Sequence, residues 1–398
     1  MIKIFHLSDL HIDIELLPKQ NFFEGLRGHN IEVWGAFRKH FKLRQENTIG
    51  NYICAITGDL SKKGDIKSFN LAKQFLFENN NSEITDEIGL KLPKEKVILI
   101  PGNHDSYNSK ILGKNSLVNF NESFGIFDPY PITKFIEHDG FSISIIAFDS
   151  TYLKNAYTLA KKLGRGIIEK EQYALAEGFL RDRKSNLRIV MLHHNPIFPP
   201  NVKKDWNLIL EGSKIFIDWI IKQKIDFVLF GHIHEDFYDV LPLKSLIRLL
   251  PSKKGFGKTL RKFYLNTSRL NDYENLQING KYLRQIDSIA YQFIKKKRPN
   301  TLKLATNFKS KKEFENYLYG LPEYSEFISE LNNFSKQETL LVMAGSLCQD
   351  NDKRKNSYIE LDFNPEQSKV NIYRHKYQPQ KMTFVTKVRE FKFHFDKL

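Results

Sequence analysis

Five short groups of polar residues in the first 234 positions have side chains that bind metal ions. They are Asp9-Leu10-His11, Gly58-Asp59, Gly102-Asn103-His104-Asp105, His193-His194 and Gly231-His232-Ile233-His234. Carboxylate, imidazole and amide ligands in this order and spacing are typical of a site for two divalent cations. Two cations can generate hydroxide at neutral pH and stabilise charge on phosphoryl oxygens. The sequence therefore predicts hydrolysis of phosphate esters.

Each polar group directly follows a short apolar run that predicts a buried strand. These five runs are residues 2–5, 52–56, 97–100, 187–192 and 227–230, and a sixth run of the same kind is residues 143–148. Residues 65–77, 169–180 and 213–222 have apolar side chains at helical spacing and predict helices between the strands. Alternating strands and helices predict a layered α/β fold. Open α/β sheets bind ligands at the carboxyl ends of their strands, so five separate loops are expected to converge there.

The alternation stops after His234 for about a hundred residues, which divides the chain into predicted parts. Residues 340–346, 357–363 and 370–377 predict three closing strands of the same domain. We therefore expect a core of 1–237, an insertion of 238–338 with helical stretches at 241–250 and 314–331, closing strands within 339–380, and a C-terminal tail of 381–398. A smaller insertion of 19–46 separates the first two motifs.

Composition excludes several classes of protein. The 398 residues are 41% hydrophobic and 13% aromatic, as in globular proteins. Cys54 and Cys348 are the only cysteines, which excludes a disulfide framework and a Cys-rich zinc module. We expect a cytoplasmic protein without membrane association, because the sequence has no signal-peptide pattern and no apolar run long enough to cross a bilayer.

The net charge of +15 is concentrated in the predicted insertion, which contains 19 Lys or Arg residues and 10 Asp or Glu residues. The insertion includes the cluster Lys295-Lys296-Lys297-Arg298. One interpretation is a surface for DNA, RNA or another polyanion. The other is a general abundance of lysine, as in proteins encoded by A+T-rich genomes. The sequence favours neither, and a lid, a protein partner or an oligomer contact through 238–338 is a further alternative.

The motifs resemble those of the calcineurin-like metallophosphoesterase superfamily, D-x-H, G-D, G-N-H-[DE], H and G-H-x-H, over residues 1–234 and the closing strands. The resemblance implies a four-layer α/β/β/α sandwich with a dinuclear metal site and a bridging hydroxide nucleophile. It assigns the metal ligands residue by residue: Asp9, His11 and His234 for the first ion, Asn103, His193 and His232 for the second, and Asp59 as the bridge.

The same resemblance places His104 at the substrate, where it protonates the leaving oxygen. An imidazole suits this role because its ordinary pKa of about 6.5 lets it carry a proton near neutral pH. Asp105 either orients His104 or caps the following turn. His193 is preferred to His194 as the ligand because it lies nearer the strand, which leaves His194 behind the ligands or at the substrate. His6, inside the first strand, is expected to be a core residue.

The nitrogen-rich ligand set disfavours magnesium alone and suits manganese above all, with iron, zinc or nickel as alternatives. The run His6-Leu7-Ser8-Asp9-Leu10-His11 and the segment Gly58-Asp59-Leu60-Ser61 resemble bacterial phosphodiesterases of the cyclic-nucleotide type and related repair nucleases. This resemblance predicts a phosphodiesterase acting on nucleotides or nucleic acid. The alternatives are a small-molecule phosphomonoesterase and a non-catalytic scaffold with the same fold, the second disfavoured because all seven ligands are present.

Overall fold

The computed structural model describes residues 2–12, 31–46, 48, 51–77, 89–106, 117–151, 164–196, 208, 210–240, 276–278, 281–283, 316–317, 319–322, 325, 339–347 and 356–392. Its contacts divide the chain into two compact units. The first comprises residues 1–198, 204–238 and 341–398, and the second comprises 199–203 and 239–340. The described part of the second unit includes a short hairpin, β11 (Leu276–Ile278) and β12 (Lys281–Leu283). The boundaries expected from the sequence stay a prediction.

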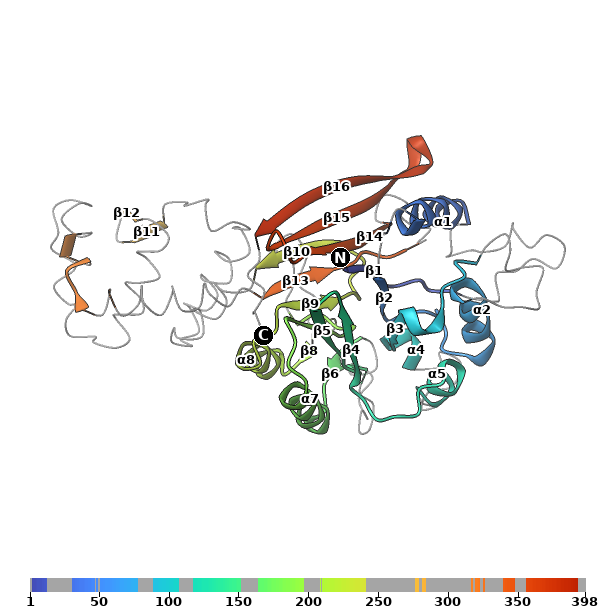
Figure 1. Cartoon of the computed structure of the whole chain (residues 1–398), viewed down its shortest axis with the longest axis horizontal. Helices are drawn as coiled ribbons and strands as arrows, with labels where there is room; N and C mark the ends of the chain where they lie inside the picture. The colour runs from blue at the N-terminus through green and yellow to red at the C-terminus, as the bar shows by residue number, and fades with distance from the viewer. Residues whose placement is uncertain are drawn as a thin grey trace. The chain divides into compact units, whose positions relative to one another are not determined.

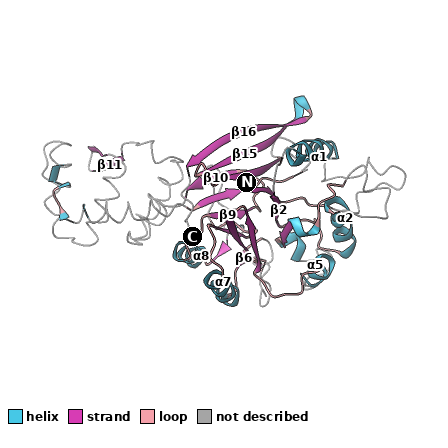
Figure 2. Ribbon diagram, in the orientation of Figure 1, coloured by secondary structure: helices cyan, strands magenta, loops and turns pink. Residues whose placement is uncertain are grey.

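A mixed six-stranded sheet carries the first half of the site, in the order β16-β15-β14-β1-β2-β3 (Figures 1 and 2). Its parallel strands are β1 (Ile2–Leu7), β2 (Asn51–Thr57) and β3 (Val97–Ile100). Antiparallel to β1 runs β14 (Ser357–Asn364), followed by β15 (Lys369–Gln378) and β16 (Thr383–Lys392). All six residues of β1 are buried, and four of them are apolar, as expected for a strand covered on both faces. The two polar residues of the strand are Lys3 and His6.

A second six-stranded sheet carries the other half, in the order β10-β13-β9-β7-β5-β4. The strands are β4 (Ile132–His138), β5 (Phe141–Ala147), β7 (Leu187–Met191), β9 (Phe227–Phe230), β10 (Phe237–Val240) and β13 (Leu340–Met343). Strands β5, β7 and β9 are parallel neighbours, so their carboxyl ends lie at one edge. A short parallel pair, β6 (Gly166–Ile167) with β8 (Leu210–Glu211), lies outside both sheets.

The helices pack by their apolar faces. In α2 (Ile66–Leu76) the side chain of Asp65 caps the N-terminus by accepting a hydrogen bond from Ser68 N at 2.7 Å, and Phe69 lies 5.5 Å from Phe120 of α5 (Leu117–Phe124). The other helices are α1 (Ile31–Glu46), α4 (Asn103–Ser106), α7 (Lys170–Asp182), α8 (Ser213–Lys222) and two single turns at Lys94–Lys96 and Pro379–Lys381. Tyr173 of α7 contacts Trp219 of α8 with a centroid distance of 5.5 Å.

The mixed α/β class expected from the sequence is confirmed, and every predicted core strand forms. The prediction of a tail from residue 381 is wrong in part, because Thr383–Lys392 pairs along its whole length with β15 as strand β16. Strand β4 and helix α1 were not predicted either. The helical stretches at 241–250 and most of 314–331 lie outside the described residues, as does Cys348, and the four-layer order stays a prediction. Among the described helices, none is long and apolar enough to cross a membrane.

Candidate metal centre

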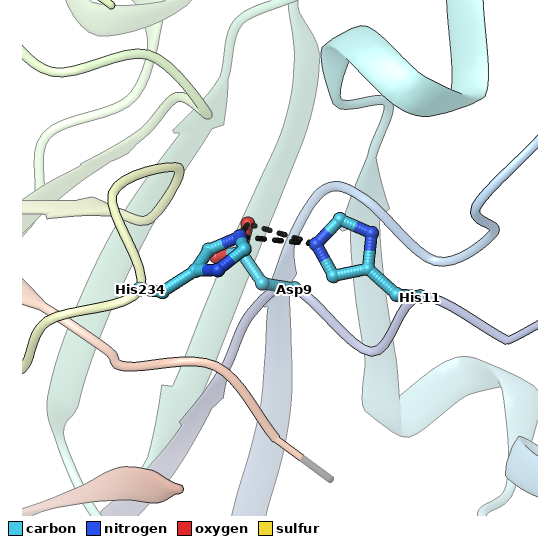
Figure 3. Close-up of side chains that lie close together, drawn as sticks. All are labelled: Asp9, His11 and His234. Atoms are coloured by element: carbon cyan, nitrogen blue, oxygen red, sulfur yellow. Dashed lines mark hydrogen bonds and ion pairs between the residues drawn. The ribbon is translucent and has the colours of Figure 1, made fainter. Parts of the chain in front are cut away.

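The predicted ligands come together from loops that follow five strands. Asp9 and His11 follow β1, Asp59 follows β2 and Asn103 begins α4 after β3. The second sheet contributes His193 after β7, and His232 and His234 after β9. Figure 3 shows Asp9, His11 and His234 turned toward one another from two separate loops. The carboxyl ends of parallel strands therefore meet here, as the sequence pattern indicates.

Asp9, His11 and His234 form the first cluster of potential ligand atoms. Asp9 Oδ1 lies 3.3 Å from His234 Nε2 and 3.8 Å from His11 Nε2. The Nε2 atoms of His11 and His234 are 3.1 Å apart. Three ligand atoms are therefore close enough to share one cation.

A second cluster consists of Asp59, His193 and His232, with Asn103 beside it. His193 Nε2 lies 3.5 Å from Asp59 Oδ2, 3.0 Å from Asn103 Oδ1 and 3.1 Å from His232 Nδ1. The same Asp59 Oδ2 lies 3.8 Å from His11 Nε2 of the first cluster. Asp59 is therefore the carboxylate placed to serve both clusters.

The ring nitrogens at the centre of each cluster fit a bound cation. A neutral imidazole has one nitrogen with a hydrogen and one with a lone pair. His11 Nε2 faces His234 Nε2 across 3.1 Å, and His193 Nε2 faces His232 Nδ1 across 3.1 Å. Without a cation, one of the two facing nitrogens must have a hydrogen, because two lone pairs at this distance repel each other. A bound cation accepts both lone pairs at once. The donor set of imidazoles, carboxylates and one amide suits a first-row transition metal.

Burial and charge set the ionisation of the ligands. Burial alone would raise the pKa of Asp59, but the charges of His193 and His104 hold it well below its usual range. Burial lowers the pKa of His11 and of His232 to about 3 each. Ionised carboxylates and neutral imidazoles are the forms that bind metal. His193 and His234 differ, because burial favours their neutral forms but carboxylate charges dominate. Asp59 raises the pKa of His193 to about 9, and Asp9 raises the pKa of His234, so a cation competes with a proton at both.

The backbone of the site is strained at most of the ligands. Positive φ angles, which side chains other than glycine rarely adopt, occur at Asp9 (55°), His11 (48°), Asp59 (52°), His232 (81°) and His234 (57°). Such conformations cost free energy and persist where the surrounding structure holds them, as is common at functional sites. The hydrogen bonds from Asp9 N to Gly58 O (3.1 Å) and from His11 N to Asp59 O (2.9 Å) hold two of these turns.

Gly102 lets the loop after β3 approach Asp59. A Cβ atom at this position would collide with the Asp59 side chain and with its backbone nitrogen. The neighbouring His104 N donates to Asp59 Oδ1 at 2.9 Å, so this loop also fixes the orientation of the carboxylate. Only a residue without a side chain fits at position 102.

His104 is half-buried, with its ring edge-on to His11 at a centroid distance of 4.9 Å. Its Nδ1 lies 3.0 Å from the Lys62 carbonyl oxygen. Since a carbonyl only accepts, Nδ1 carries a hydrogen and Nε2 has the lone pair of the neutral ring. His104 also forms a third group of potential ligand atoms with His11 and Asp59.

Asp105 joins two loops of the site and accepts from Gly102 N at the start of α4. Its buried carboxylate accepts hydrogen bonds from Leu60 N (3.0 Å), Ser61 N (2.8 Å), Ser61 Oγ (3.1 Å) and Gly102 N (3.0 Å). Burial and the charge of Asp59 raise its pKa to about 6, against these hydrogen bonds. Asp105 therefore ties the loop after β2 to the loop after β3, which carry Asp59 and Asn103.

His194 lies behind the ligands, in contact with the rings of His193 and His232 at centroid distances of 5.1 and 4.7 Å. Ser150 Oγ accepts from the backbone nitrogens of His193 and His194 (3.3 Å each) and lies 2.9 Å from His194 Nδ1. The hydroxyl hydrogen must then point to Nδ1, which places the His194 hydrogen on Nε2. Burial lowers the pKa of His194 well below its usual range. Ser150 was not singled out from the sequence, because a lone serine after a strand has no distinguishing pattern.

Comparison with known proteins agrees with this geometry. A family model for calcineurin-like phosphoesterases matches residues 2–236, more than half of the chain. The chain belongs to this family. A protein of Coxiella burnetii named "probable cyclic nucleotide phosphodiesterase" is 26% identical over 239 residues, 59% of this chain and 77% of its own. One with the same name from Vesicomyosocius okutanii is 27% identical over 234 residues, 58% of this chain and 78% of its own.

Among solved structures, a dimetal phosphatase from Danio rerio superposes with a TM-score of 0.43 at 8% identity, covering 97% of this chain and 98% of that one. The structure of PhoD gives a TM-score of 0.45 at 8% identity, covering 98% of this chain and 70% of that one. The family assignment rests on the sequence model and the shared motifs. The family is one of metallophosphoesterase hydrolases that use divalent metal ions, and the His and Asp clusters of this chain could hold such ions.

Proposed function

We propose that this calcineurin-like phosphoesterase is a phosphodiesterase that acts on nucleotides or nucleic acid in the cytoplasm. The observation that carries the proposal is the pair of ligand clusters joined by Asp59, with His104 beside His11 and Asp59. The names of the two bacterial relatives support a diester substrate. The proposed metal is manganese, with iron, zinc or nickel as alternatives, because imidazole nitrogens dominate the ligand set.

The site residues divide the work between holding two cations and handling the substrate. Asp9, His11 and His234 would hold one ion, and Asn103, His193 and His232 the other, with Asp59 between them. The bound ions would supply an activated water and stabilise charge on the phosphoryl group. The protein supplies fixed ligand positions through its strained loops, and these positions need not change during the reaction.

His104 is the proposed acid for the leaving group. Its Nδ1 donates to Lys62 O, which holds the ring in place, and His104 lies in one group of potential ligand atoms with His11 and Asp59. A protonated Nε2 can donate to the ester oxygen that departs, and the Lys62 carbonyl stabilises the resulting positive ring by accepting from the other nitrogen. The hydrogen bond to Lys62 therefore gives His104 both orientation and support for its charged form.

The experiment compares hydrolysis of bis-p-nitrophenyl phosphate, p-nitrophenyl phosphate and 3′,5′-cyclic AMP with added Mn²⁺, for wild type, His104→Ala and His138→Ala. We expect faster diester than monoester hydrolysis, and a fall in kcat of about 10²–10⁴ in His104→Ala, the usual contribution of a general acid. His138, a half-buried histidine of β4 paired with Asp139, is the matched control and should have no effect.

Two results would contradict the proposal. A preference for the monoester would make the protein a phosphomonoesterase. Absence of hydrolysis of all three substrates, with Mn²⁺ bound as measured by metal analysis, would favour the scaffold alternative. Trace nuclease contamination would be recognised by activity that survives in His104→Ala.

A further inference from the structure

The hairpin of β15 and β16 presents four basic side chains on one face. Directly paired residues of antiparallel strands point to the same face, and Arg374 pairs with Lys387. Lys376 and Arg389 lie two residues further along their strands and share this face. The strand order of the first sheet places β16 at its edge (Figure 1).

The opposite face of the hairpin is occupied by α1. Arg44 of α1 lies over the ring of Tyr373 at 4.7 Å, and His40 stacks on Phe384 at 5.9 Å. The four basic side chains therefore point away from α1, to the side of the sheet where Asp236 and Tyr238 follow the metal-ligand loop.

Two of the four basic side chains already form ion pairs with a carboxylate. Asp236, two residues beyond His234, forms ion pairs with Arg374 and with Lys376, the second at 3.6 Å. The other two, Lys387 and Arg389, are exposed, and the described ion pairs on this face include neither of them. Lys387 stands directly opposite Arg374, whose charge is balanced by Asp236, so Lys387 and Arg389 supply the exposed positive charge on the described part of this face.

Arg389 is held in place by two aromatic rings. Its guanidinium carbon lies 4.8 Å from the ring centroid of Phe391 and 5.6 Å from that of Tyr238. The two rings contact each other edge-on at 6.1 Å, and both are half-buried. The guanidinium is thus oriented before any ligand binds, and its planar donors match a phosphate group. Basic groups with adjacent aromatic rings are the combination that binds single-stranded nucleic acid, because phosphates and bases are contacted together.

The distance from the metal centre sets the size of the ligand. Three strand spacings separate β16 from β1, about 14 Å, and the register places Lys387 level with His6 and Arg389 level with Ile4, three and five residues before Asp9. The offset along the strands brings the distance to the metal centre to about 17–22 Å. Stacked nucleotides advance about 3.4 Å each, so about five to seven nucleotides cover this length. A strand of several nucleotides with one phosphodiester at the metal centre reaches Lys387 and Arg389, whereas a cyclic mononucleotide does not.

We propose that Lys387, Arg389, Tyr238 and Phe391 form a surface that binds single-stranded nucleic acid next to the metal centre. This surface makes a polynucleotide the substrate class, and it rests on the proposed phosphodiesterase function. The ion pairs of Asp236 with Arg374 and Lys376 join the hairpin to the loop that carries His234, so the surface and the centre keep a fixed spacing.

The test compares wild type with the double variant Lys387→Glu/Arg389→Glu and the charge-matched control Lys39→Glu/Lys184→Glu, two exposed lysines on α1 and after α7. Binding of fluorescein-labelled oligo-dT of 12 nucleotides is measured by anisotropy in EDTA at several salt concentrations. Hydrolysis of the same oligonucleotide and of bis-p-nitrophenyl phosphate is measured with Mn²⁺.

We expect the double variant to bind the oligonucleotide at least tenfold more weakly, with a salt slope reduced by about 1.4, the value for two lost phosphate contacts. Its kcat/KM should fall for the oligonucleotide and stay unchanged for the small diester. The control should match wild type in both assays. Equal losses on both substrates, unchanged oligonucleotide binding, or tighter binding of duplex than of single strand would overturn the proposal. If wild type cleaves no diester but its oligonucleotide binding still depends on Lys387 and Arg389, the proposed function fails and the binding surface stands.

Discussion

At the scale of single residues, one carboxylate, that of Asp59, lies close to both ligand clusters. Asp59 Oδ2 lies within 3.8 Å of ring nitrogens in both clusters, and its other oxygen accepts from His104 N. Burial lowers the pKa of His11 and His232, whereas nearby carboxylates raise the pKa of His193 and of His234, so cation binding competes with a proton at these two ligands. Loss of Asp59 should therefore affect both ions.

Asp59→Asn should bind fewer than one Mn²⁺ per chain, whereas wild type should bind two, because the neutral amide cannot bridge two cations. Wild type should gain about 2.7 kcal/mol in unfolding free energy at Mn²⁺ concentrations of 100 times Kd. The measurement is metal analysis after dialysis together with thermal unfolding at increasing Mn²⁺. Asp128→Asn, an exposed carboxylate, is the control, and a full Mn²⁺-dependent shift in Asp59→Asn would contradict the bridging role.

At the scale of elements, strand ends bring the ligands together and a buried carboxylate keeps the loops in register. Asp105 accepts four hydrogen bonds from the loops after β2 and β3. The close approach of Gly102 to Asp59 depends on the same contact between loops. A change at Asp105 should therefore loosen the site without removing a ligand.

Asp105→Asn should lower the unfolding free energy by about 2–4 kcal/mol, because an amide leaves some of the four buried donors without an acceptor. Urea unfolding in EDTA measures this change, and Mn²⁺ titration should show weaker binding as Asp59 and Asn103 lose their relative position. Asp128→Asn again serves as the control. Unchanged stability and Mn²⁺ affinity would mean that the two loops are held by other contacts.

At the scale of the whole molecule, stability depends on a polar cluster between α1 and the first sheet. Buried Glu360 accepts from Arg44 Nε (2.7 Å) and Nη2 (2.9 Å) and lies 3.2 Å from His375 Nε2, while His40 Nδ1 lies 2.7 Å from the Tyr358 hydroxyl. Burial lowers the pKa of His40 to about 4 and also lowers that of His375. Burial opposes the ionisation of Glu360, but His375 and Arg44 bring its pKa down to about 2.

Unfolding should become easier as the pH falls from about 6.5 toward 4. In this interval the unfolded chain binds protons at His40 and His375 that the folded chain does not, so acid favours the unfolded state. Glu360 stays ionised in the folded state until about pH 2, and its contribution begins to fall only below its unfolded pKa of about 4.5. Urea unfolding in EDTA at pH 7.5 and at pH 5 measures the decrease in unfolding free energy.

The control for this prediction is His40→Gln, which cannot titrate. The decrease in its unfolding free energy between pH 7.5 and pH 5 should be smaller than that of wild type by about 1 kcal/mol, after allowance for the partial solvent exposure of His40. The comparison isolates His40 from the metal-site histidines, which titrate in both proteins. An identical loss in the two proteins would contradict the assignment.

The sequence by itself determined the α/β class, the core strands and the residues that meet at the centre. Strands are short and locally encoded by apolar runs, and polar residues just beyond parallel strands lie at one sheet edge wherever the strands are placed. It did not determine the roles of Asp105 and Ser150, which depend on distant backbone nitrogens, or the pairing of Thr383–Lys392 with β15. The insertion of 238–338 stays a prediction.

Only the tertiary structure decided which side chains share a surface. Lys387 and Tyr238 are about 150 positions apart in the chain, and no sequence pattern links them. Strand register places Lys387 opposite Arg374, and packing places Arg389 against Tyr238. A local sequence pattern encodes the burial and period of one segment, whereas contacts between segments depend on how the two sheets and α1 pack.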